Sequence, residues 1–112
     1  MNKLKRFESE QGLICTFKTD ELTALCPFDF GGPDMYDLTI KYQTANHTAE
    51  SKSLKQWLHS YRDTEISAED LAYEIHENVV DCIAPSRCYV RLEQARRGGI
   101  EETVEVGNVS LK

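Results

Sequence analysis

A cysteine and an aspartate stand on either side of a loop that contains glycine and proline. Cys26 directly precedes a proline, and Asp34 lies eight residues after Cys26. Reactive groups concentrate in loops of this kind, and a thiol acts as a nucleophile only when a proton acceptor or a positive field favours its thiolate. If the loop folds back, Asp34 could serve Cys26 as acid or base. The alternative is that Cys26 is a buried structural cysteine, the commoner fate of this residue type.

The other three cysteines have no comparable setting. Cys15, Cys82 and Cys88 fall at inward positions of their expected elements, so we predict that they belong to the core. The four cysteines form no C-x-x-C pair, and the three histidines have no zinc-type spacing with them. We therefore expect no metal site.

The segment "ESKSLKQW" at positions 50–57 carries two cations at helical spacing. Lys52 and Lys55 lie three residues apart, so they share one face of a helix. Together with the hydroxyls of Ser51 and Ser53 and the open amides of a helix N-terminus, they could bind phosphate. The alternative is an ordinary solvated helix end.

Two weaker signals lie elsewhere. Arg96 and Arg97 precede Gly98, so this segment is either a simple hairpin turn or a turn whose charges bind a phosphorylated cofactor. Glu69 lies near the start of an expected helix, where a negative charge is favourable in any case. A carboxylate can also accept two N–H bonds from a purine-like base, which makes Glu69 a candidate substrate ligand.

The hydrophobic periodicity predicts an α+β domain in which two helices pack on one face of an antiparallel sheet. The element order is β-β-α-α-β-β. The expected strands cover residues 13–18, 36–42 and 88–93, with a last strand around Val104 and Val106; the expected helices cover about 50–62 and 67–83.

Chain length and net charge indicate the number of domains and the kind of partner. The 112 residues predict one domain, 1–112, with a thin core and two open sheet edges that association into a homo-oligomer could close into a barrel. The net charge of −6 disfavours broad contact with nucleic acid and favours a small-molecule partner. We find no signal peptide and no apolar run of membrane-spanning length, so we expect a cytoplasmic protein that binds no membrane.

Four segments together resemble the QueF family, the NADPH-dependent 7-cyano-7-deazaguanine reductases. They are "TALCP…GGPD", "ESKSLKQW", "SYRDTEISAED" and "RRGGI". The resemblance implies the T-fold (tunnelling fold), whose unit has the β-β-α-α-β-β order. It also implies homo-oligomers of two stacked rings, a decamer, with sites between subunits.

The resemblance implies a reaction as well. Cys26 would attack the nitrile carbon to form a covalent thioimide, Asp34 would protonate the nitrile nitrogen, and NADPH would reduce the carbon to a primary amine, a step of queuosine biosynthesis and tRNA modification. Glu50 and Glu69 would hold the deazaguanine edge. The cofactor would be bound by Ser51, Lys52, Ser53, Lys55, Arg97 and Gly98.

The chain departs from the family pattern at two neighbouring positions. Family reductases usually carry Phe-His where this chain has Ser67 and Ala68, so an aromatic lid and an imidazole are missing. QueF-like amidinotransferases, which add ammonia to the same nitrile within a nucleic acid to give an archaeosine-type product, are therefore the alternative reading. A non-catalytic T-fold purine binder is a third, but it would have no use for Cys26 beside Asp34.

Overall fold

The structure is a computed structural model that describes residues 3–28 and 33–112. The central part of the predicted Cys26–Asp34 loop lies outside these residues. In chain order the elements are β1 (Arg6–Glu8), β2 (Ile14–Leu25), β3 (Pro33–Gln43), β4 (His47–Ala49), α1 (Ser51–His59), a 3₁₀ turn (Ser60–Asp63), α2 (Ala68–Ile83), β5 (Arg87–Arg97), β6 (Ile100–Gly107) and a second 3₁₀ turn (Val109–Leu111).

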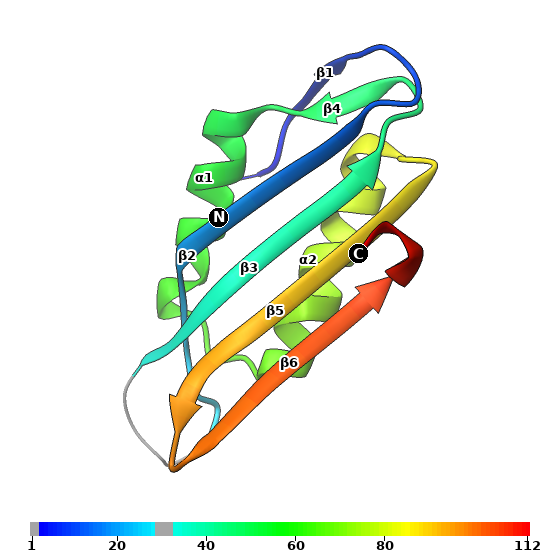
Figure 1. Ribbon diagram of the computed structural model, residues 1–112. Helices are drawn as coiled ribbons and strands as arrows, with labels where there is room; N and C mark the ends of the chain where they lie inside the picture. The colour runs from blue at the N-terminus through cyan, green and yellow to red at the C-terminus, as the bar shows by residue number, and fades with distance from the viewer. Residues whose placement is uncertain (1–2, 29–32) are drawn as a thin grey trace.

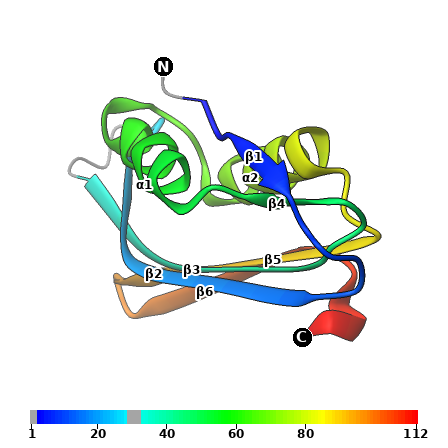
Figure 2. The same cartoon turned by 90° about the horizontal axis from the view of Figure 1, so that it is seen from above.

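The four long strands form one antiparallel sheet in the order β2-β3-β5-β6. Both helices lie on one face of this sheet, as Figure 1 and Figure 2 show from two directions. The predicted α+β class is therefore confirmed, and the four strands of the main sheet and the two helices follow one another in the predicted order, although two further short strands are present. Neither helix in the described part of the chain is long and apolar enough to cross a membrane.

The small sheet formed by β1 and β4 was not predicted. Each of these strands has three residues, with Phe7 paired to Thr48, and so short a segment carries no readable alternation. The pair lies on the helix side of the main sheet (Figure 2).

The core lies between the main sheet and the helices. Along β3, Leu38, Ile40 and Tyr42 are buried at every second position, as the alternation predicts. From the helix side, α2 contributes a buried stripe at the 3.6-residue period: Leu71, Ile75, Val79 and Ile83. Each such side chain stabilises the fold by about 1.5–3 kcal/mol.

Strand β2 is longer than predicted and contains a register shift between Thr19 and Leu22. At the shift, the Thr19 hydroxyl accepts a hydrogen bond from the Glu21 amide at 3.0 Å. The shift breaks the alternation of buried and exposed residues, so the predicted strand of residues 13–18 ended too early. It also exchanges the two faces of the strand: Phe17 packs on the core before the shift, and Leu22 does so after it.

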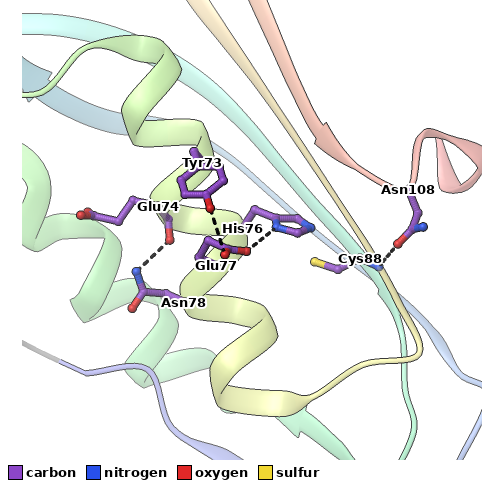
Figure 3. Close-up of polar contacts among 7 residues, drawn as sticks. All are labelled: Tyr73, Glu74, His76, Glu77, Asn78, Cys88 and Asn108. Atoms are coloured by element: carbon purple, nitrogen blue, oxygen red, sulfur yellow. Dashed lines mark hydrogen bonds and ion pairs between the residues drawn. The ribbon is translucent and has the colours of Figure 1, made fainter.

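The end of the sheet where β6 finishes is closed by tight packing against α2. Gly107 has a φ of 91° and lies against His76 and the Cys88 carbonyl, so a Cβ there would come within 2.5 Å of the His76 ring. Asn108 then accepts a hydrogen bond from the Cys88 amide at 3.0 Å (Figure 3). On the helix, the ring of His76 interacts with Glu77 at 3.3 Å. This end of the sheet therefore carries structural contacts.

Candidate active site

Cys26 follows the last residue of β2 and is partly exposed. Because of the register shift, Leu22 and Ala24 face the helices, and Cys26 continues that even-numbered series. Without the shift, the series of Cys15 and Phe17 would send an even-numbered residue to the other face. The bulge thus directs the thiol toward the helix side of the sheet.

The end of β2 is tied to the segment before α2. The Leu25 amide donates to the Thr64 carbonyl at 2.9 Å, and the Ile66 amide donates back to the Leu25 carbonyl at 3.0 Å. Helix α2 then begins after Ser67, whose hydroxyl accepts a hydrogen bond from the Asp70 amide at 3.1 Å and so caps the helix N-terminus. These bonds bring the N-terminus of α2 next to Cys26.

Asp34 lies near the start of β3 and is 4% exposed. Its carboxyl group forms an ion pair with the guanidinium group of Arg97, the last residue of β5. Arg97 is held there by a two-residue turn, since Gly98 and Gly99 both have positive φ (56° and 80°) and connect it to Ile100. The hairpin thus supplies a cation to the predicted acid.

Cys26, Asp34 and Glu69 line one cavity of about 680 Å³, together with Arg97 and Gly98. This volume is typical of a small-molecule site. Four separate elements therefore contribute predicted site residues to a single cavity. Ser67 and Ala68, where the family pattern has Phe-His, also line it.

Glu102 of β6 lines the same cavity and was not predicted as a site residue. Its carboxyl group is hydrogen-bonded to that of Glu69, and this bond, aided by burial, raises the pKa of Glu102 to about 7. The same bond lowers the pKa of Glu69. A signal was present in the sequence, because Glu102 precedes Val104 and Val106 in the inward-facing series of the strand.

Gln94 and Tyr36 are the other polar residues on this part of the sheet face, and neither was predicted as a site residue. The strand register pairs Tyr36 with Gln94 and Gln94 with Glu102, so the three form a row across β3, β5 and β6. The Tyr36 hydroxyl is buried and has no hydrogen-bond partner among the described residues. Burial is the largest cause that raises the pKa of Tyr36, followed by the charges of Asp34 and Glu102.

The predicted phosphate-binding residues of α1 lie elsewhere. Ser51 and Lys55 line a second cavity, between α1 and the sheet, which His59 also lines. Lys52 is exposed on the same helix. Within one chain, the structure does not bring these residues into the cavity of Cys26.

Glu50 and Ser53 are engaged at the start of α1. The two carboxylate oxygens of Glu50 accept hydrogen bonds from the Lys52 and Ser53 amides, both at 2.8 Å, which lowers the pKa of Glu50. The Ser53 hydroxyl donates to the Glu50 carbonyl and accepts from the Lys5 amide at 2.9 Å. Both residues shape the helix N-terminus, and their predicted ligand roles stay predictions.

The fold has a counterpart among solved structures. The crystal structure of an archaeosine synthase QueF-Like in the apo form superimposes with a TM-score of 0.75 over 88% of this chain and 94% of that chain, at 21% sequence identity. The domain is therefore a T-fold unit.

Sequence relatives identify the family. The family of QueF-like proteins matches residues 33–112. The NADPH-dependent 7-cyano-7-deazaguanine reductase of Syntrophus aciditrophicus is 41% identical over 106 residues, which are 92% of this chain and 75% of the relative. The enzyme of the same name from Wolinella succinogenes is 30% identical over 86 residues, covering 77% of this chain and 68% of the relative. The chain belongs to the QueF family, as its motifs predicted.

Proposed function

We propose that this protein reduces 7-cyano-7-deazaguanine to 7-aminomethyl-7-deazaguanine with NADPH, in line with relatives that are named NADPH-dependent 7-cyano-7-deazaguanine reductases. The observation that carries the proposal is the shared cavity of Cys26 and Asp34. A thiol and a buried carboxyl group in one small-molecule site suit attack on an electrophilic carbon with proton transfer to its neighbour.

The first step forms a carbon–sulfur bond. The sulfur of Cys26 adds to the nitrile carbon, one π bond of the triple bond breaks, and the proton released by the thiol reaches the nitrile nitrogen through Asp34. The product is a neutral thioimide, so this step needs no oxidant or reductant. Glu69 accepts N–H bonds from the ring edge and orients the nitrile toward the thiol.

The residues on α1 fit the cofactor that the family implies. Lys55 and Ser51 line an open cavity, and Lys52 is exposed on the same helix, which gives a cationic, hydroxyl-bearing surface suited to phosphates. When bound there, NADPH would supply the two hydrides that take the thioimide carbon to an amine, with breakage of the carbon–sulfur bond and return of Cys26 to its thiol. Since the two cavities are separate within one chain, we propose that a neighbouring subunit of a homo-oligomer completes each site.

One observation favours a second candidate. Ser67 and Ala68 are small and leave the cavity broad beside Glu69. An open site of this kind suits a base that is already part of a nucleic acid, and ammonia would then add to the same thioimide to give an amidine and release Cys26. This QueF-like amidinotransferase reaction uses no NADPH.

The deciding experiment measures NADPH absorbance in the presence of 7-cyano-7-deazaguanine. The proposal predicts oxidation of two NADPH per substrate, with two protons consumed from solvent. Lys52→Ala and Lys55→Ala should each raise the KM for NADPH about tenfold, whereas Lys41→Ala, on β3 and outside the second cavity, should not. Formation of an amidine from ammonia without NADPH oxidation would establish the second candidate instead.

A further inference from the structure

The carboxyl groups of Glu69 and Glu102 meet in the Cys26 cavity from two different elements. Glu69 is in the first turn of α2, and Glu102 is on β6. Both residues line this cavity, and a hydrogen bond between their carboxyl groups is the largest cause of the pKa shift of each. Two carboxyl groups form such a bond only when one of them carries a proton. The pair therefore holds one proton and one negative charge.

The proton belongs mainly to Glu102. The backbone amide of Glu69 itself, in the first turn of α2, favours the ionised form of its carboxyl group and lowers its pKa. Glu102 lies on a strand and gains no such help, and its pKa is raised to about 7 by the bond to Glu69 and by burial. Glu69 is the acceptor of the pair and Glu102 is the donor.

A second observation concerns Tyr36, which lies in one cross-strand row with the cavity residues Gln94 and Glu102. The buried Tyr36 hydroxyl has no hydrogen-bond partner among the described residues, although it is 2% exposed as a residue. Unsatisfied buried polar groups are rare in native proteins and call for an explanation. The charges that act on this hydroxyl are those of the cavity: Asp34, Glu102, Cys26 and Glu69.

We propose that Glu102 is a positioning residue whose protonated carboxyl group holds Glu69 as a carboxylate directed at the ring N–H groups of the substrate. The role rests on the proposed function, because it assigns Glu69 to the deazaguanine edge. Loss of the Glu102 proton would remove the hydrogen bond and place two negative charges in one cavity. Glu69 would then turn away, and binding of the base would weaken.

The protonation of Glu102 determines how the affinity for the substrate changes with pH. Glu102 is protonated below pH 7 and ionised above it, so binding should weaken as the pH rises. The other ionisable groups around the cavity are Cys26 at the end of β2, Asp34 and Tyr36 on β3, and Arg97 on β5. Measuring binding on a Cys26→Ala background removes the thiol, and the remaining groups are common to all variants.

The test uses 7-cyano-7-deazaguanine and calorimetry on full-length Cys26→Ala protein at pH 6 and pH 8. We expect the Kd to rise about tenfold across this range, since a group with a pKa near 7 is about one-tenth protonated at pH 8. Adding Glu102→Gln should flatten the profile, because the amide donates to Glu69 at every pH. Adding Glu102→Ala should weaken binding at both values.

The matched control is Glu101→Gln, which changes the neighbouring exposed carboxylate that pairs with Arg96. It should retain the tenfold change. A Glu102→Gln protein that still loses affinity above pH 7 would overturn the role of Glu102 while leaving the proposed function intact. Failure of every variant to bind the base at either pH would overturn the proposed function, and this role with it.

Discussion

Two tyrosines on the same face of β3 show how the two ends of the sheet differ. The Tyr42 hydroxyl is fully used: it shares a hydrogen bond of 2.7 Å with Thr48 and accepts another of 3.0 Å from the Ala49 amide. The Tyr36 hydroxyl, six residues away, has no partner among the described residues. Since both rings are buried, the contrast lies in what surrounds the oxygen atoms, and the Tyr36 end is the one where we propose the active site.

Two cysteines show the same difference between the two ends of the sheet. Cys88 is 2% exposed, and burial raises its pKa to about 12, so its thiol is inert at neutral pH. Cys26 is partly exposed and lines the cavity. One sheet thus carries a closed structural end and an open polar end, and residue type alone does not distinguish them.

The largest expected effect is the loss of turnover when the Cys26 thiol is removed. Cys26→Ala should abolish NADPH turnover with 7-cyano-7-deazaguanine, because no covalent intermediate can form. Cys88→Ala is the matched control at the closed end, and it should keep turnover while lowering the unfolding free energy by about 1–2 kcal/mol. Steady-state kinetics and chemical denaturation measure the two effects, and loss of turnover in Cys88→Ala alone would reverse the assignment of the two ends.

A smaller loss is expected from Asp34→Asn. The amide preserves the shape of the side chain but cannot relay a proton, so adduct formation should slow by about 10²–10⁴-fold. Single-turnover kinetics measure the rate, and Asp37→Asn, on the same strand but exposed on the opposite face, is the control. An unchanged rate in Asp34→Asn would remove this residue from the chemistry.

The smallest expected effect is a difference in unfolding free energy between the Tyr42→Phe and Tyr36→Phe variants. Tyr42→Phe should lower the unfolding free energy by about 1–2 kcal/mol, because it leaves the buried Thr48 and Ala49 groups without their partner. Tyr36→Phe removes a hydroxyl that has no partner within the described chain, so it should change stability little. Urea denaturation of the two variants compares them directly, and an equal loss in both would contradict the contrast.

Much of the fold follows from local patterns in the sequence. The buried alternation of β3 and the apolar stripe of α2 were predicted because each pattern persists over several periods. The extension of β2 was missed because the bulge at Asp20 and Glu21 interrupts its alternation. The β1–β4 pair was missed because three residues carry no period.

The site was predictable in part. Cys26, Asp34 and Glu69 were singled out by residue type and by family motifs, and they meet in one cavity. Glu102 and Gln94 were missed because a single polar residue at an inward-facing strand position does not indicate a site. It does so only when its neighbours on the adjacent strands are also polar. Those neighbours lie on strands that are distant in sequence, since both helices separate β3 from β5.

The central claim is that the Cys26 sulfur bonds covalently to the nitrile carbon. Its most direct test is the intact mass of the wild-type protein mixed with 7-cyano-7-deazaguanine without NADPH, followed by peptide mapping. The account predicts a gain of one substrate mass per chain, located on Cys26 and absent in Cys26→Ala. An unchanged mass, or an adduct on Cys15, Cys82 or Cys88, would contradict it.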